Sequence, residues 1–171
     1  MNIPVLIITG SVGVGKTSVA WEISELLENK KIPHAYVDAD VCYLYPRPED
    51  DPRGVKLYLK NLKSIWLNMQ KSGASKLIIT KVIESLDDIE ELKRVLPNTD
   101  IQIIRLHAPI DTISERLNKR EIGSGFKWHQ ERAIKLLDLW EKNPVEDHLI
   151  ETDNRTIREI AEEILKFIKW A

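Results

Sequence analysis

The sequence predicts a single α/β domain, with a parallel sheet of five strands and helices on both of its faces. Short apolar runs alternate along the chain with segments whose apolar residues recur at helical spacing, which is the pattern of repeated β-α-β units. The chain has 171 residues, of which 43% are hydrophobic and 30% are charged, and this suits one compact domain. A glycine-rich segment directly follows the first apolar run and leads into the first helical segment.

The expected strands and helices follow one another in regular order. The strands are apolar runs at residues 3–9, 32–38, 76–82, 100–107 and 147–151. The helices have apolar residues three and four apart, at residues 18–27, 55–69, 87–96, 110–117, 128–142 and 156–170. Pro97 ends the third helix, and Pro109 suits the first turn of the fourth. This three-layer arrangement places ligands at the carboxyl ends of the strands.

The glycine-rich segment, residues 10–17, matches the phosphate-binding P-loop (Walker A) pattern G-x-x-x-x-G-K-[ST]. Glycines let the backbone N–H groups point at phosphate oxygens, and the next helix adds the positive end of its dipole. We expect Lys16 to reach the β- and γ-phosphates and the Thr17 hydroxyl to hold Mg²⁺. A glycine-rich turn with an incidental lysine is the alternative, which the flanking strand and helix disfavour.

The expected cofactors are therefore ATP and Mg²⁺. The nucleotide-binding residues expected from the P-loop are Gly10, Ser11, Val12, Gly13, Val14, Gly15, Lys16, Thr17 and Ser18.

Composition limits the expected partners. The formal net charge is −2 and the chain has no block of lysine or arginine, so we expect no nucleic-acid partner. No apolar run approaches the length of a membrane span, and a single cysteine excludes an internal disulfide. We expect a cytoplasmic protein, a monomer or homodimer, that does not bind membranes.

Four segments together resemble the small P-loop kinases, which include nucleoside monophosphate, shikimate, gluconate and adenylylsulfate kinases. Besides the P-loop, Asp38-Ala39-Asp40 resembles the D-x-D of shikimate kinase, and residues 116–123 resemble the R-L-x-x-R start of the mobile lid. Residues 152–156 resemble the loop that cups adenine. The resemblance covers essentially the whole chain as one P-loop kinase-like domain, with a short lid at about residues 120–130. With the strand–helix alternation, it implies the strand order 2-3-1-4-5.

Asp38 and Asp40 lie two residues apart, so both side chains point to one face while the strand persists. One carboxylate would hold Mg²⁺ through water, and the other would accept a proton or hydrogen bond from an acceptor hydroxyl. Resemblance to shikimate kinase implies that Asp38 is on the magnesium side and Asp40 on the substrate side. A pair of carboxylates that only cap a turn is the alternative. The third strand ends at Lys81 and Val82 without an acid, so a metal-binding carboxylate must come from elsewhere.

Arg116 and Arg120 are four residues apart and share a helix face. We expect Arg120 to stabilise the transferred phosphoryl group, and the resemblance implies that Arg116 lies by the adenine. Gly123-Ser124-Gly125 is a plausible hinge. A solvated helix face is the alternative for the two arginines. Asp153 and Asn154 are expected to read the adenine edge, to cap the last helix, or both.

The acceptor is expected to bind near the loop that follows the D-x-D. The candidate substrate-binding residues are Asp40, Arg47, Arg53, Lys81 and Arg132. A solvent-exposed lysine at a strand end is the alternative for Lys81. Neighbouring acids at residues 49–51 argue against a highly charged phosphate acceptor.

The sequence thus favours a phosphotransferase that moves the γ-phosphate of ATP to a small-molecule acceptor, onto a hydroxyl. Lys16 and Arg120 would stabilise the transferred group, while Asp40 would orient or deprotonate the acceptor. A nucleotide-dependent switch or regulatory ATPase is the alternative.

Overall fold

The computed structural model describes residues 2–41, 44–120 and 125–170, and the side chains of Val41 and Arg120 lie outside this description. Its core is a parallel sheet in the order β2-β3-β1-β4-β5, which confirms the predicted order. The strands are β1 (Ile3–Gly10), β2 (Ala35–Asp38), β3 (Leu77–Thr80), β4 (Thr99–His107) and β5 (His148–Glu151).

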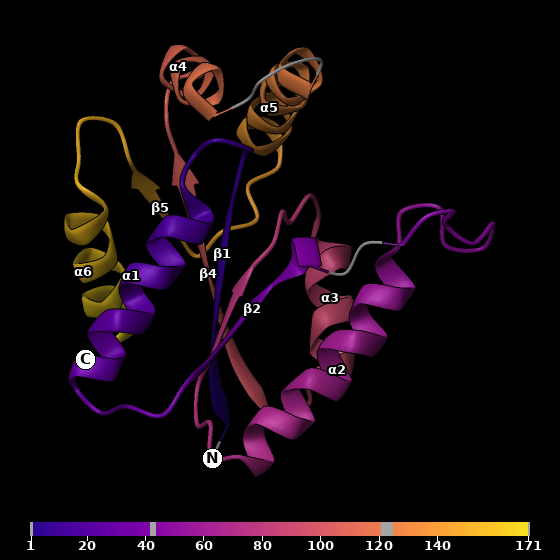
Figure 1. Cartoon of the computed structure of the whole chain (residues 1–171), viewed down its shortest axis with the longest axis vertical. Coiled ribbons are helices and arrows are strands. Elements are labelled where there is room, and N and C mark those ends of the chain that lie inside the picture. Colours follow the sequence, from indigo (N-terminus) through magenta and orange to yellow (C-terminus); the bar gives the residue numbers. More distant parts are fainter. Residues whose placement is uncertain (1, 42–43, 121–124, 171) are drawn as a thin grey trace.

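Within the described residues, six helices surround the sheet (Figure 1). They are α1 (Lys16–Asn29), α2 (Val55–Lys71), α3 (Leu86–Val95), α4 (Ile110–Arg120), α5 (Gly125–Lys142) and α6 (Ile157–Ile168), and a 3-10 turn, η1 (Ala39–Val41), follows β2. Helices α1 and α6 cover one face and α2 and α3 the other, while α4 and α5 stand at the end where β1 leads into α1 (Figure 1).

The central strand β1 is buried on both faces, as expected for a parallel sheet between helices. Leu6 and Ile8 belong to the core beneath α1 and α6, whereas Val5 and Ile7 belong to the core beneath α2 and α3, and all four are fully buried. Because β1 is held from both sides, the glycine-rich loop at its carboxyl end starts from a fixed point.

Three expectations about element boundaries are corrected. Strand β2 begins at Ala35 rather than at residue 32, because Pro33 has no N–H to donate to a strand ladder, and its carbonyl accepts hydrogen bonds from Ser75. Helix α5 begins at Gly125, so this glycine is helical rather than part of a hinge, and residues 123 and 124 lie outside the described structure.

The cap of α6 is Thr156, not Asp153 or Asn154. Thr156 and Glu159 form a reciprocal capping box, in which each side chain bonds the backbone N–H of the other. No helix in the described part of the chain is both long and apolar enough to cross a membrane.

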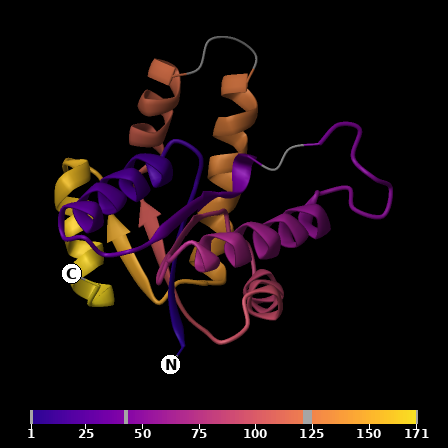
Figure 2. The ribbon, with the colours of Figure 1, turned by 60° about the horizontal axis from the view of Figure 1, so that its bottom comes forward.

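Residues 44–54, which precede α2, extend away from the body of the molecule (Figure 2). The inner end of this segment is fixed by Asp51, whose buried carboxylate accepts a hydrogen bond from the Leu57 N–H at 3.0 Å. The Gly54 N–H donates to the Asp51 carbonyl, so the turn that carries Arg53 is held against the start of α2.

Candidate active site

The loop at residues 10–17 has the backbone that phosphate binding requires. Gly10 has φ 144°, and a Cβ there would lie 2.7 Å from the Leu106 carbonyl oxygen and 2.9 Å from Cγ1 of Val14. Gly15, at the start of α1, has φ 107°, a conformation that L side chains rarely adopt. Both glycines are therefore required by the local structure.

Lys16 folds its ammonium back onto this loop. Its Nζ donates to the carbonyl oxygens of Gly10 and Ser11, at 2.9 Å each. The ammonium is thereby held over the loop's own backbone, within reach of any phosphate that the loop amides bind.

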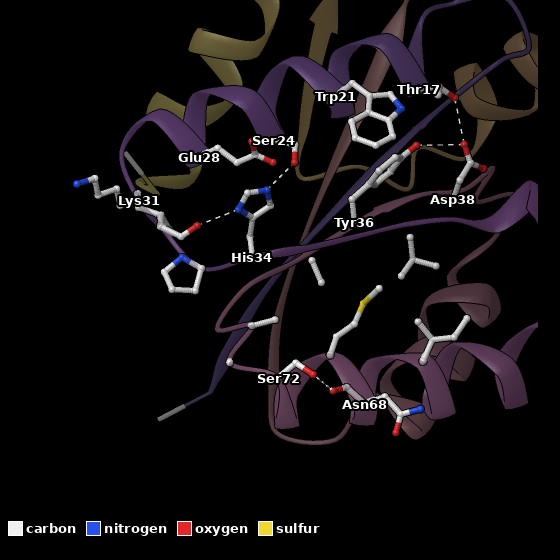
Figure 3. Close-up of a pocket in the computed structure, with 18 residues that line it drawn as sticks. Thr17, Trp21, Ser24, Glu28, Lys31, His34, Tyr36, Asp38, Asn68 and Ser72 are labelled. Atoms are coloured by element: carbon white, nitrogen blue, oxygen red, sulfur yellow. Dashed lines mark hydrogen bonds between the residues drawn. The ribbon is translucent and has the colours of Figure 1, made fainter.

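Asp38 connects the loop to the edge strand β2. Its Oδ2 accepts from the Thr17 hydroxyl at 3.2 Å and from the Tyr36 hydroxyl at 3.1 Å (Figure 3). Its Oδ1 accepts from the Asp40 N–H at 2.9 Å. Burial, reinforced by the nearby Asp38 carboxylate, raises the pKa of Tyr36 above its ordinary value. The Tyr36 hydroxyl therefore stays protonated and can donate to Asp38.

These groups suit Mg²⁺. The ion prefers oxygen ligands and uses one or two carboxylates together with water and substrate phosphates, and Thr17 and Asp38 offer a hydroxyl and a carboxylate in contact. Within the described residues, no group of three His, Cys, Asp or Glu side chains could hold a metal. A metal here would rely on phosphate and water for its other ligands.

The D-x-D pair is arranged differently from the expectation. Asp40 lies in η1 rather than on β2, so the two carboxylates do not share a strand face. The chain turns at this point, and Asp38 caps the turn by accepting the Asp40 N–H. Asp38 therefore caps a turn, as the alternative reading of the pair expected, and it also contacts Thr17.

A cavity of about 610 Å³ opens over the P-loop, a volume typical of small-ligand sites. Its lining is formed by residues 12–19, Asp40, Val82, Arg116, Trp128, His129, Arg132, Leu136, Thr152, Arg155, Ile157 and Ile160.

Arg116 is fixed between the P-loop and the β5–α6 loop. Its guanidinium donates to the Val14 carbonyl at 3.2 Å, and to the hydroxyl and carbonyl of Thr152 at 3.1 and 3.0 Å. The residues of this loop that line the cavity are Thr152 and Arg155, whereas Asp153 accepts from Thr112 and from its neighbour Asn154.

The lid residues are only partly placed. Arg120 is the last residue of α4, its side chain lies outside the described structure, and so do residues 121–124. Beyond them, Arg132 on α5 donates to Glu84 Oε1 at 2.6 Å, with both side chains about one-third exposed.

A second cavity, of about 260 Å³, adjoins the first. Its lining is formed by Ala39, Asp40, Arg47, Arg53, Gly54, Val55, Tyr58, Lys81, Val82, Glu84 and Asp88. Asp40 and Val82 line both cavities, so the two spaces meet at these residues.

The β3–α3 segment that carries Lys81 and Glu84 is held by three hydrogen bonds to residues of β1 and α5. The Lys81 N–H donates to the Ile8 carbonyl at 3.2 Å, and the Ile83 N–H donates to the buried Thr9 hydroxyl at 2.9 Å. The Trp140 indole donates to the Ile83 carbonyl at 2.7 Å. Sequence patterns gave no signal for these contacts, because each joins residues far apart in the chain.

A third cavity, of about 1180 Å³, is a groove along β2 between α1 and α2 (Figure 3). Trp21 and Tyr36 pack edge to face in it, with ring centroids 5.3 Å apart. The groove touches the P-loop only at Thr17, whereas residues 12–19 all line the 610 Å³ cavity. The P-loop therefore faces the 610 Å³ cavity rather than this groove.

By sequence, no protein-family model and no curated protein matches the chain. By structure, the tunicamycin resistance protein of Deinococcus radiodurans matches with a TM-score of 0.68 at 19% identity, covering 99% of this chain and 97% of that one. The APS kinase CysC of Mycobacterium tuberculosis, solved with AMPPNP and APS, gives a TM-score of 0.67 at 17% identity and covers 98% of each chain.

The shikimate kinase of Acinetobacter baumannii, solved with shikimate, gives a TM-score of 0.60 at 19% identity, covering 99% of this chain and 94% of that one. These similarities show that the chain has the fold of the small P-loop kinases, as its motifs predicted.

Proposed function

We propose that this protein is a small-molecule kinase that transfers the γ-phosphate of ATP to an acceptor hydroxyl. The observation that carries the proposal is the meeting of two cavities at Asp40. One cavity is built on the P-loop, and the other is lined by side chains that could bind a second, smaller molecule. A kinase must hold its two substrates side by side, and a carboxylate at their junction can accept the proton of an acceptor hydroxyl.

In the proposed reaction the P-loop amides and Lys16 bind the triphosphate, with the Lys16 ammonium exchanging its carbonyl partners for phosphate oxygens. Thr17 and Asp38 would hold Mg²⁺, which neutralises charge on the phosphates when bound. Asp40 orients the acceptor hydroxyl and accepts its proton as the oxygen attacks the γ-phosphorus, and ADP leaves. We assign Arg116 to the adenine side of the site.

The remaining expectations extend this proposal. We infer a single domain over residues 1–171 with a short lid at about residues 120–130, in which Arg120 acts on the transferred phosphoryl group. Asp153 and Asn154 stay candidates for adenine contact next to Thr152 and Arg155. The neighbours support two substrates in such a fold, since one was solved with AMPPNP and APS and another with shikimate.

The experiment is an acceptor screen with ATP and Mg²⁺, which measures ADP formation above the acceptor-free rate and the mass of the phosphorylated product. Lys16→Ala should abolish transfer with an unchanged circular dichroism spectrum, while Lys30→Ala, at an exposed lysine that follows the other end of α1, should not. Asp40→Asn should lower transfer by a factor of about 10²–10⁴ and keep ATP affinity.

A nucleotide-dependent switch or regulatory ATPase, the other class that a P-loop permits, would behave differently in this screen. It would hydrolyse ATP at a rate that no small molecule raises, and Asp40→Asn would leave that rate unchanged. Such a result would overturn the proposed kinase activity.

A further inference from the structure

We propose that the acceptor is a small hydroxy acid with a single carboxylate, and that Lys81 and Arg53 bind this carboxylate in the 260 Å³ cavity. The inference rests on the proposed kinase function and goes beyond it by naming the class of acceptor. The charged side chains around the cavity support it, because two of the acids already have partners whereas Lys81 and Arg53 are not paired with any acid that the structure describes.

Two of the acids that line this cavity already accept hydrogen bonds from other groups of the protein. Glu84 accepts from Arg132 at 2.6 Å. Asp88 Oδ2 accepts the backbone N–H groups of Glu84 and Ser85, at 2.8 and 3.1 Å, as part of the capping box of α3. Asp40 is the remaining acid, and it lies where the two cavities meet.

Two cations of this cavity, Lys81 and Arg53, are not paired in this way with an acid of the described residues. Lys81 is partly buried, and its Nζ has one carbonyl partner, that of Val82 at 3.3 Å, and lies 5.3 Å from the centre of the Tyr58 ring. Arg53 has no hydrogen bond or ion pair with any residue that the structure describes. Arg47 donates to the Pro52 carbonyl at 3.2 Å.

The two unmatched cations are close enough to oppose each other. Burial lowers the pKa of Lys81 and outweighs the opposing charges of Asp88 and Glu84, and the smaller effect of the Arg53 charge also lowers this pKa. A buried ammonium without a carboxylate partner is unfavourable, and an anion placed between two cations removes both the repulsion and the desolvation penalty. The cavity is therefore prepared for an anion.

A single carboxylate fits better than a phosphate or a neutral group. The carboxylates of Asp40, Glu84 and Asp88 line the same cavity and would repel a dianion more strongly than a monoanion. A guanidinium with no other partner can pair both oxygens of a carboxylate. The volume of about 260 Å³ lies just below the range of drug-sized sites and limits the acceptor to a small molecule.

Binding can be tested without ATP by following the reactivity of Lys81. We would label the protein with trace acetic anhydride and measure acetylation at Lys81 by mass spectrometry, with lactate, glycerate and 4-hydroxybenzoate as probes. The matched neutral probes are the corresponding amides, and glycerol phosphate and inorganic phosphate represent phosphate. Lys63, an exposed lysine of α2, is the internal reference.

We expect at least one hydroxy acid, and none of the amides, to protect Lys81 while Lys63 reacts unchanged. Lys81→Met and Arg53→Gln should each weaken calorimetric binding of that acid by about tenfold or more, and Lys63→Met should not. The affinity should fall as the pH rises above the pKa of unliganded Lys81, because the neutral amine no longer pairs with the carboxylate.

Other outcomes would overturn the inference. Stronger protection by glycerol phosphate or inorganic phosphate would assign the cavity to phosphate. Equal protection by an acid and its amide, or no protection by any acid at millimolar concentration, would show that charge is not recognised.

The kinase function and the carboxylate site can be rejected independently of each other. Phosphorylation of a neutral acceptor would support the kinase function and reject the proposal that the acceptor carries a carboxylate. If an acid protects Lys81 but neither that acid nor any other screened acceptor becomes phosphorylated, the anion site would stand and the kinase function would be rejected.

Discussion

Asp38 illustrates how one residue can organise a site. Its carboxylate accepts from the Thr17 hydroxyl, the Tyr36 hydroxyl and the Asp40 N–H, so it joins the P-loop helix, the edge strand and the turn that carries Asp40. The Tyr36 hydroxyl also shares a hydrogen bond of 3.0 Å with Thr80 on β3. Replacing a carboxylate by an amide here should affect both the metal and the fold.

We expect Asp38→Asn to raise the Mg²⁺ concentration needed for half-maximal activity and to destabilise the protein by about 1–3 kcal/mol. The reason is that an amide NH₂ would face a hydrogen-bond donor at one of the two oxygen positions. Magnesium titration and thermal unfolding would measure the two effects, with Glu25→Gln on the exposed face of α1 as the control. An unchanged magnesium requirement would reduce Asp38 to a turn cap.

Lys81 gives a pH-dependent prediction. Because burial lowers its pKa from 10.5, the unfolded chain binds more protons than the folded protein between the lowered pKa and 10.5, and stability rises with pH in that interval. At lower pH the charged ammonium is buried at a penalty. Lys81→Met should therefore be more stable than the native protein near neutral pH, and the difference should shrink as the pH rises toward 10.5.

Melting temperatures across this pH range would test the sign, and Lys63→Met should show a difference that does not change with pH. A Lys81→Met variant that is less stable than the native protein near neutral pH would contradict the burial argument.

At the level of single residues, the sequence identified groups whose chemistry is fixed by local pattern. Gly10, Lys16 and Thr17 could be named because the P-loop encodes its own geometry, and Gly10 indeed has no room for a side chain. Tyr36 and Glu84 could not be named, because their partners Thr80 and Arg132 lie 44 and 48 residues away in the chain.

At the scale of elements, the start of α6 shows what a local pattern can decide. Thr156 and Glu159 form the Thr-x-x-Glu capping box, whereas Asn154 has φ 54° and Asp153 accepts from Thr112 on α4. Thr156→Ala should cost about 1 kcal/mol of stability, because an N–H at the helix start loses its acceptor.

The companion variant is Asn154→Gly, which should change stability by less than about 0.5 kcal/mol because glycine adopts a positive φ without strain. Chemical denaturation of both variants measures the difference. A larger loss for Asn154→Gly than for Thr156→Ala would return the capping role to Asn154.

The order of elements was predictable, and their ends were less so. Apolar runs located each of the five strands that the structure describes, since a parallel strand buried on both faces needs a continuous apolar stretch. The start of β2 was misplaced because Pro33 has no N–H for a ladder and its carbonyl accepts from Ser75, and the D-x-D turn was given only as the alternative because strand geometry was extended through Asp40. Both errors arise from contacts or turns that apolar periodicity does not encode.

At the scale of the whole molecule, the Glu84–Arg132 ion pair spans the two cavities. Glu84 lines the 260 Å³ cavity and Arg132 lines the cavity over the P-loop. Glu84 belongs to the pinned β3–α3 segment, while Arg132 belongs to α5, which follows the proposed lid. The pair thus joins the β3–α3 segment to the helix that follows the proposed lid.

Both side chains are about one-third exposed, so the pair should contribute no more than about 1 kcal/mol to stability. Its expected importance is in positioning Arg132 toward the phosphates. Arg132→Met should therefore lower kcat/KM strongly, Glu84→Gln should lower it less, and the double variant should match Arg132→Met, because Glu84 acts only through the arginine. Kinetics with the acceptor found in the screen, together with thermal unfolding, would provide the cycle. Additive losses in the double variant would instead mean that Glu84 contacts a substrate itself.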